Sequence, residues 1–135
     1  MNEINTPDKF MSSKTILVVD DSKTDFLYVK NILDHGGYKV VYAPSGKEGV
    51  EVAKQIKPDC ILMDVVMPEM NGFQATRAIS RQLETADIPV LMLSSKSQQT
   101  DRVWAERQGA IDYVVKPANP KLLLSKLRAL LGSNK

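Results

Sequence analysis

The sequence predicts an α/β fold in which a doubly wound, five-stranded parallel sheet carries five helices on its two faces. Short apolar runs alternate along the chain with segments whose apolar residues recur at helical spacing. The runs are continuously apolar, as in Ile16–Val19 and Val90–Leu93, whereas a sheet with one exposed face would alternate apolar and polar residues. Strict alternation of strands and helices is typical of a parallel sheet covered on both faces by crossover helices.

The chain begins its regular structure with a strand, a helix and a second strand. Residues 15–19 form the first expected strand, and residues 23–35 form a helix whose apolar positions share one face. Ser22 is a suitable N-cap for this helix, and the two glycines at 36–37 end it. Residues 38–42 form the second expected strand.

The second helix opens with Ser45 and Glu48, which have the spacing of a capping box. Pro58 stops this helix, and residues 59–63 form the third expected strand. A third helix is expected at 72–83. Its core-facing side should contain Phe73, Thr76, Ile79 and Leu83.

The last part of the chain supplies two strands and two helices. The strands are expected at 88–93 and 111–115, with a helix at 97–108 between them. That helix offers few apolar anchors, so it should be easy to displace. The final helix is expected at 120–131, with Asn119 as its cap and proline at its first position.

Length and composition indicate one globular domain. The 135 residues suffice for a single sizeable core, and we expect a flexible tail at 1–13, a domain at 14–132 and a short C-terminal end at 133–135. The net charge is +2 and the basic residues are scattered, which gives no indication of nucleic-acid binding. A lone cysteine, Cys60, excludes an internal disulfide and fits a reducing compartment.

The N-terminus lacks the charged start and apolar stretch of a signal peptide. No apolar run approaches the ~18 residues that a membrane span requires. We therefore expect a cytoplasmic protein that does not associate with a membrane.

Polar residues follow four of the five expected strands at the point where each strand ends. Asp20 and Asp21 follow the first strand, Asp64 the third, Ser94 the fourth and Lys116 the fifth. Because the carboxyl ends of parallel strands lie at one edge of the sheet, where open α/β folds bind ligands, these side chains should converge.

The converging residues have the chemistry of a phosphoryl-transfer site. Paired carboxylates repel by ~3 kcal/mol at about 5 Å and an effective dielectric near 20, and a divalent cation removes that cost. Oxygen ligands favour Mg²⁺, which in turn recruits phosphoryl oxygens. Lys116 would supply positive charge to the phosphoryl oxygens, and Ser94 would supply a hydrogen bond to them. Asp64 is the natural nucleophile, since a carboxylate can form an aspartyl phosphate.

A set of short motifs at this edge carries a family resemblance. The motifs are Val19-Asp20-Asp21-Ser22, Leu62-Met63-Asp64, Met67-Pro68, Asn71-Gly72, Leu93-Ser94 and Tyr113-Val114-Val115-Lys116-Pro117. Over residues 14–132 the chain resembles the receiver domain of bacterial two-component response regulators. Asn71–Arg77, Thr100–Trp104 and Arg107–Ala110 are most similar to stand-alone CheY-like proteins of the PilH type, which regulate twitching motility. The resemblance implies a flavodoxin-like sheet with strand order 2-1-3-4-5.

The resemblance also implies a role for each residue at the sheet edge. Asp64 would accept the phosphoryl group from a phosphohistidine on a sensor histidine kinase. Asp21, Asp64 and the backbone carbonyl of Val66 would ligate Mg²⁺, and Asp20 would contribute through water. Lys116 would pair with Asp64 or with its phosphate.

A switch to a partner-binding face is implied as well. Ser94 would close onto the phosphoryl oxygen, Tyr113 would change rotamer with it, and the face of the fourth helix, fifth strand and fifth helix would be remodelled. On that face Asp101 and Arg102 would contact a partner. Trp104 either contacts the partner too or packs beneath the helix. A chemotaxis-type kinase and an unidentified effector are the implied partners, in control of type IV pilus twitching or phototaxis. The protein would be a monomer or a phosphorylation-dependent dimer, and a phosphoacceptor rather than a turnover enzyme.

Two positions depart from the family pattern. Val66 lies where fast-hydrolysing members often have a polar residue, and a valine cannot orient an attacking water, so we expect slow unaided dephosphorylation. Ala118 lies where an aromatic residue is frequent, which leaves the local packing open. The Lys116–Pro117 peptide bond is often cis in the family.

Other functions remain as alternatives. A phosphatase of the haloacid dehalogenase type needs a carboxylate where this chain has Val66, and a flavin binder would find its phosphate repelled by Asp20 and Asp21. A phosphate sink for a shared kinase and a phosphate-independent adaptor are both compatible with the motifs.

Overall fold

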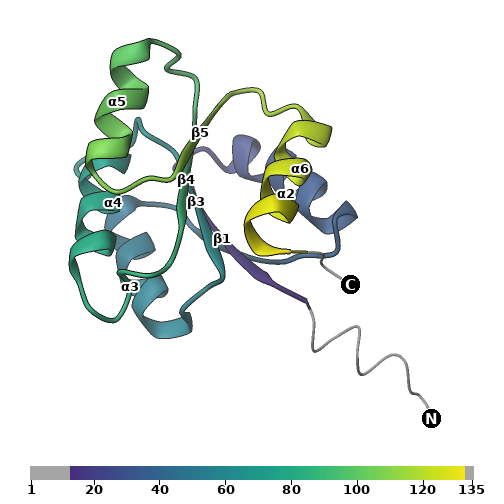
Figure 1. The fold of residues 1–135 in the computed structure, drawn as a ribbon, viewed down its shortest axis with the longest axis horizontal. Coiled ribbons are helices and arrows are strands. Elements are labelled where there is room, and N and C mark those ends of the chain that lie inside the picture. The colour runs from purple at the N-terminus through teal and green to yellow at the C-terminus, as the bar shows by residue number, and fades with distance from the viewer. Residues whose placement is uncertain (1–12, 133–135) are drawn as a thin grey trace.

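The computed structural model describes residues 13–132 and consists there of a five-stranded parallel sheet with helices on both faces (Figure 1). The strand order is β2-β1-β3-β4-β5, which confirms the predicted fold class. The strands are β1 (Thr15–Val19), β2 (Lys39–Ala43), β3 (Cys60–Met63), β4 (Val90–Ser94) and β5 (Asp112–Val115). The helices are α2 (Lys23–His35), α3 (Gly46–Ile56), α4 (Gly72–Arg81), α5 (Gln99–Arg107) and α6 (Pro120–Leu131).

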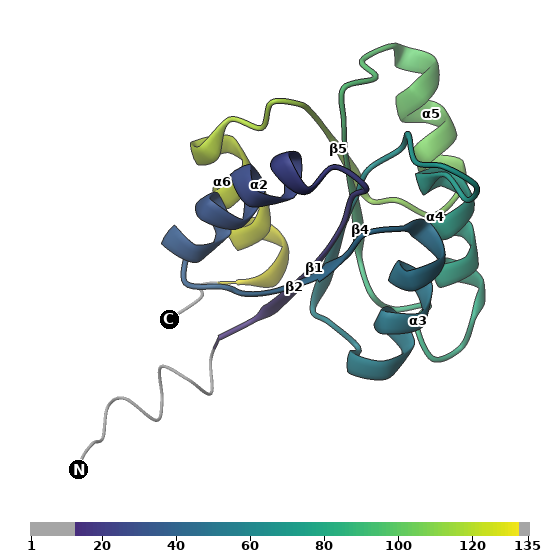
Figure 2. The ribbon, with the colours of Figure 1, turned by 180° about the vertical axis from the view of Figure 1, so that it is seen from behind.

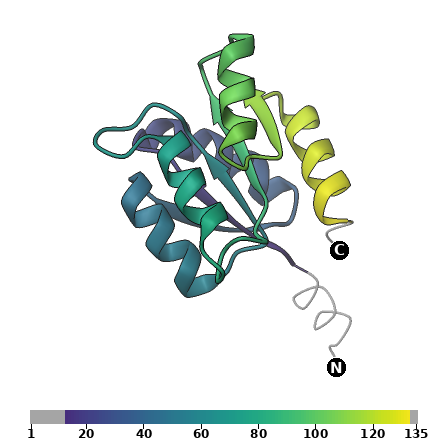
Figure 3. The same ribbon diagram turned by 60° about the vertical axis from the view of Figure 1, so that its left-hand side comes forward.

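The helices divide into two layers. α2 and α6 cover one face of the sheet, and α3, α4 and α5 cover the other (Figures 1 and 2). Successive side chains of a strand point to opposite faces, so Ile16 and Val18 contribute to the core under α2 and α6, while Leu17 and Val19 contribute to the opposite core. On the three-helix face α4 lies between α3 and α5 (Figure 3).

Helix starts match the capping residues read from the sequence. The side chains of Ser22, Ser45 and Asn119 each accept a hydrogen bond from the backbone N–H three residues later. α2 and α6 have the predicted bounds, whereas the predicted strands differ from the observed ones by one or two residues at some ends. These offsets arise because pairing with a neighbouring strand, not apolarity alone, decides where a strand ends.

The prediction for the third helix was wrong at its C-terminal end. α4 stops at Arg81, and Leu83, expected in the core, is 97% exposed. The backbone N–H of Thr85 donates to the carbonyl of Gln82, and its hydroxyl donates to the carbonyl of Ile79. A buried threonine thus satisfies the end of the helix and turns the chain before Leu83 can face the core.

The fourth predicted helix is confirmed as the least anchored. α5 is shorter than the expected 97–108, and Ala105 is its one buried residue. Because few apolar contacts hold this helix against the sheet, its displacement requires little loss of burial.

The tail predicted at 1–13 falls, except for Ser13, outside the described residues, as does the end at 133–135. Among the described residues, none of the helices has the length and apolarity to cross a membrane.

Candidate functional site

The structure brings three predicted carboxylates together at the carboxyl edge of the sheet. Carboxylate oxygens of Asp20, Asp21 and Asp64 all lie within 4.8 Å of one another. Asp20 and Asp64 are buried, whereas Asp21 is exposed. The three side chains therefore gather negative charge at one point, and the cluster is open to solvent at Asp21.

The sheet itself sets the position of these residues. The backbone N–H of Asp64 donates to the carbonyl of Val19, and that of Asp20 donates to the carbonyl of Ala43. On the other side the N–H of Lys116 donates to the carbonyl of Ser94. The parallel register thus continues one residue beyond the strands and fixes their polar ends side by side.

The loop after Asp64 packs tightly against the helix that follows it. Gly72 donates its N–H to the carbonyl of Val65 at 2.8 Å, and a Cβ at Gly72 would overlap the backbone of Asp64. Asn71 caps α4 in a reciprocal capping box with Gln74. The Asn-Gly pair is therefore needed to bring the start of α4 against the chain at Asp64, while Val66 points outward with 58% of its surface exposed.

Lys116 is the cation of the site, and its ammonium contacts three carboxylates. Its Nζ lies 2.7 Å from Asp20, 2.8 Å from Asp25 and 3.4 Å from Asp64. Burial alone would lower the pKa of this lysine, but hydrogen bonds to Asp20 and Asp25 and the charge of Asp64 raise it above its usual value. The ammonium therefore stays charged throughout the physiological range.

Asp64 is the carboxylate whose ionisation is most disturbed. Burial raises its pKa from 3.8 to about 6, and the charge of Asp20 adds to that rise. Lys116 acts in the opposite direction but does not fully compensate. A cation held by the three carboxylates would favour the ionised form, which is the form that acts as a nucleophile.

The donor set fits Mg²⁺. All three side chains offer carboxylate oxygens, and one side of the cluster is open to water. Mg²⁺ is bound in proteins through one or two carboxylates while it keeps several waters. Histidine and cysteine, which would favour zinc, are absent from this cluster.

Ser94 and Tyr113 lie beside each other in the adjoining part of the edge. Ser94 is fully buried, and its hydroxyl accepts a hydrogen bond from the N–H of Lys96 at 3.3 Å. Tyr113 is buried too, and its hydroxyl donates to the carbonyl of Lys96 at 2.8 Å. The same backbone segment thus holds both side chains, so a movement of that segment would affect both.

α5 carries the three residues predicted for partner contact, Asp101, Arg102 and Trp104. Trp104 is 49% exposed, so it does not pack beneath the helix, and Arg107 lies over its ring at 6.0 Å. Arg102 stacks over the ring of Tyr113 at 5.3 Å and links α5 to β5. The carboxylate of Asp101 accepts from the N–H of Gln98 and caps the helix.

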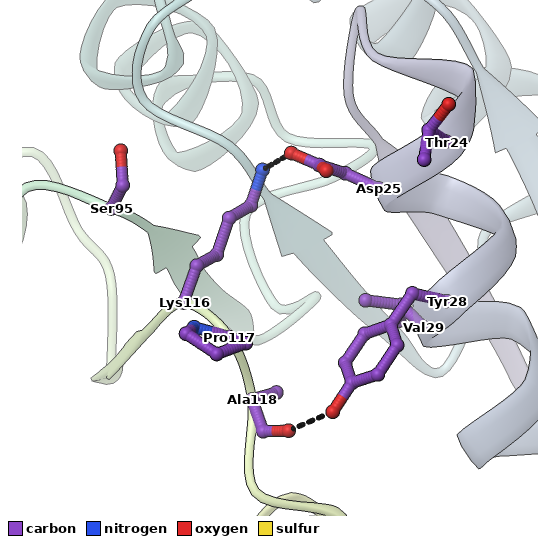
Figure 4. Close-up of a pocket in the computed structure, with 8 residues that line it drawn as sticks. All are labelled: Thr24, Asp25, Tyr28, Val29, Ser95, Lys116, Pro117 and Ala118. Carbon is purple, nitrogen blue, oxygen red and sulfur yellow. Dashed lines mark hydrogen bonds and ion pairs between the residues drawn. The ribbon is translucent and has the colours of Figure 1, made fainter.

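A pocket of about 460 Å³ adjoins Lys116 between α2 and the segment after β5 (Figure 4). It is lined by Thr24, Asp25, Tyr28, Val29, Ser95, Lys116, Pro117 and Ala118. The small side chain of Ala118 leaves this space, and the hydroxyl of Tyr28 donates to the Ala118 carbonyl across it. The Lys116–Pro117 bond is cis, as the family resemblance implied.

Sequence reasoning missed Asp25 and Tyr28 as parts of this edge. Asp25 follows Ser22 at the spacing of a capping residue, and that spacing favours a purely local role. Its contact with Lys116 joins residues 91 positions apart in the chain. The sequence does show an acidic residue in the first turn of the helix. That feature alone does not indicate that Lys116 is its partner.

Comparison with known proteins identifies close relatives. The family model described as "Response regulator receiver domain" matches residues 16–128. The chain is 47% identical to protein PilH of Pseudomonas aeruginosa over 117 residues, which are 87% of this chain and 97% of that protein.

Solved structures show the same fold. Chemotaxis protein CheY4 of Vibrio cholerae superimposes with a TM-score of 0.82 at 33% identity, over 87% of this chain and 98% of that one. The receiver domain of a sensor histidine kinase from Pseudomonas aeruginosa, solved with a magnesium ion coordinated in the active site cleft, gives a TM-score of 0.83 at 30% identity. That comparison covers 90% of this chain and 99% of the other.

Proposed function

This chain belongs to the response regulator receiver family, and from that premise we propose that it is a single-domain response regulator phosphorylated on Asp64. The observation that carries the proposal is the geometry at the sheet edge, where Asp64 is held among two further carboxylates and the Lys116 ammonium. Such a set provides a nucleophile, a place for a divalent cation and a fixed positive charge. Residues 14–132 form the proposed receiver domain.

The proposed reaction transfers a phosphoryl group from a phosphohistidine to Asp64. A carboxylate oxygen of Asp64 forms a bond to phosphorus as the bond from phosphorus to the imidazole nitrogen breaks, and that nitrogen keeps the electron pair. Asp21, Asp64 and the Val66 carbonyl would hold Mg²⁺, with Asp20 acting through water. The ion would neutralise charge on the phosphoryl oxygens. Lys116 would pair with the phosphoryl group once it is attached.

We propose that phosphorylation is read out through Ser94 and Tyr113. The Ser94 hydroxyl would turn to a phosphoryl oxygen, and the Lys96 backbone that holds both side chains would move with it. Because α5 is weakly anchored, this movement would reposition the face formed by α5, β5 and α6. Trp104, Asp101 and Arg102 on that face would contact the effector.

The partners follow from the family. A receiver domain implies a histidine kinase that donates the phosphoryl group and a target that reads its state. We propose a kinase of the chemotaxis type and a role in type IV pilus twitching or phototaxis, which the similarity to PilH supports. The proposed compartment is the cytoplasm, where the free cysteine Cys60 would remain reduced. The protein would be a phosphoacceptor and not an enzyme with turnover.

The test is the intact mass of the protein after incubation with Mg²⁺ and acetyl phosphate. The parent should gain one phosphate, the Asp64→Asn variant should gain none, and Asp34→Asn on the outer side of α2 should behave like the parent. Phosphorylation of Asp64→Asn would show that another residue is the acceptor. If the parent gains no phosphate from acetyl phosphate or from a chemotaxis-type kinase, the phosphate-independent adaptor replaces the proposed function.

A further inference from the structure

The Lys116 ammonium lies closer to two other carboxylates than to the phosphoacceptor. Its contacts with Asp20 and Asp25 are hydrogen bonds of 2.7 and 2.8 Å, whereas Asp64 is 3.4 Å away. Figure 4 shows the lysine side chain extended towards α2, with its ammonium meeting the Asp25 carboxylate. The position of the cation in the site is therefore set partly by a residue outside the three-carboxylate cluster.

Local structure leaves the Asp25 carboxylate available for this contact. Asp25 is the third residue of α2, where an acidic side chain commonly reaches back to the N–H of the N-cap. Here the N–H of Ser22 instead donates to Asp20 at 2.9 Å. Asp25 therefore turns towards Lys116, and its negative charge is favoured at the start of a helix.

Asp25 and Lys116 both line the pocket, and the lysine is the more buried of the two. The Lys116 side chain is 16% exposed, whereas that of Asp25 is 47% exposed. If the lysine moves, water can therefore hydrate the Asp25 carboxylate. The ammonium of Lys116 is too buried for water to replace its partners, so it must keep anionic ones.

We propose that Asp25 is a positioning residue that restrains Lys116 away from Asp64, so that the phosphorylated state forms only as the Asp25–Lys116 ion pair opens. This inference rests on the proposed function. A phosphoryl group on Asp64 adds oxygens beyond the carboxylate, and Lys116 must leave one of its present partners to reach them. Asp25, the more exposed partner, is the one released.

The expected effect is modest because one partner is half exposed. Removing the charge of Asp25 should favour the phosphoryl-bound arrangement by about two- to five-fold, which corresponds to the range measured for partly exposed ion pairs.

Beryllium fluoride, a mimic of the phosphoryl group on an aspartate, provides the test. Its affinity for the protein with Mg²⁺ is measured by calorimetry for the parent and for Asp25→Asn, and the variant should bind about two- to five-fold more tightly. Asp25→Glu keeps the charge and should bind as the parent does. Asp34→Asn is the matched control, since Asp34 lies on the same helix, pairs with Lys30 at 2.7 Å and has a side chain that is 48% exposed.

A second measurement needs neither metal nor phosphate. In the protein without Mg²⁺, the NMR signal of the Lys116 side chain should shift in Asp25→Asn and stay unchanged in Asp34→Asn.

Unchanged or weaker binding of beryllium fluoride by Asp25→Asn would overturn the proposal, as would equal tightening in Asp25→Glu. A parent protein that gains no phosphate from any donor would instead remove the proposed function, whatever the behaviour of the Asp25 variants.

Discussion

Replacing Asp64 by asparagine should stabilise the metal-free protein at neutral and alkaline pH. The buried Asp64 carboxylate has a pKa raised from 3.8 to about 6, so the folded protein holds this proton more tightly than the unfolded chain. Above pH 6 the folded state must ionise the group in an unfavourable place. At ~1.4 kcal/mol per pKa unit, the shift corresponds to a loss of about 3 kcal/mol in the free energy of unfolding.

Asparagine has nearly the same shape and no charge, so Asp64→Asn removes this loss. Lys116 keeps its hydrogen bonds to Asp20 and Asp25 in the variant and is not left unpaired. We expect a gain of about 1–3 kcal/mol at pH 8, the lower figure allowing for imperfect hydrogen bonding of the new amide.

The assay is urea unfolding in the presence of a chelator, at several pH values between 4 and 8. The gain should be full above pH 6, shrink as the pH falls towards 3.8, and vanish where the carboxyl group is protonated in both states. Adding Mg²⁺ should stabilise the parent more than the variant, because the variant lacks one ligand. The control Asp34→Asn, which alters an exposed ion pair, should change stability by less than about 0.5 kcal/mol at every pH.

Two results would refute this reasoning. One is a variant no more stable than the parent at pH 8, which would mean that burial does not disfavour the Asp64 charge. The other is a gain of the same size at pH 4 and pH 8, since a change independent of pH cannot arise from ionisation of this carboxyl group.

Three further changes have defined outcomes. Val66→Asn should shorten the lifetime of the phosphorylated protein, measured by loss of phosphate from the purified form, because an exposed amide two residues after Asp64 can orient a water. An unchanged lifetime would contradict this. Gly72→Ala should lower the urea midpoint and slow phosphorylation by acetyl phosphate, since its Cβ would displace the Asp64 backbone; normal values for both would count against the close approach. Leu83→Ala should change the free energy of unfolding by less than about 0.5 kcal/mol, because Leu83 is exposed, whereas loss of the buried Ile79 side chain in Ile79→Ala should cost about 2–5 kcal/mol. Similar costs for the two variants would place Leu83 in the core.

Much of the fold was predictable because its signals are local. Continuous apolar runs predicted the parallel sheet. The capping residues Ser22 and Asn119 predicted two helix starts without information from the rest of the chain. The end of α4 was not predictable from periodicity, since Leu83 continues the apolar pattern of the helix. The hydroxyl of Thr85, which bonds to the carbonyl of Ile79, ends the helix earlier.

For the site, the sequence by itself determined which chemistry gathers at the sheet edge. Asp20, Asp21, Asp64 and Lys116 follow strands, and parallel strands must end at the same edge, so the sequence predicts their proximity. Only the tertiary structure decided how the cation is shared. The crossing of α2 past the segment after β5 brings Asp25 to Lys116, and a contact between residues so distant along the chain leaves no periodic or capping signal.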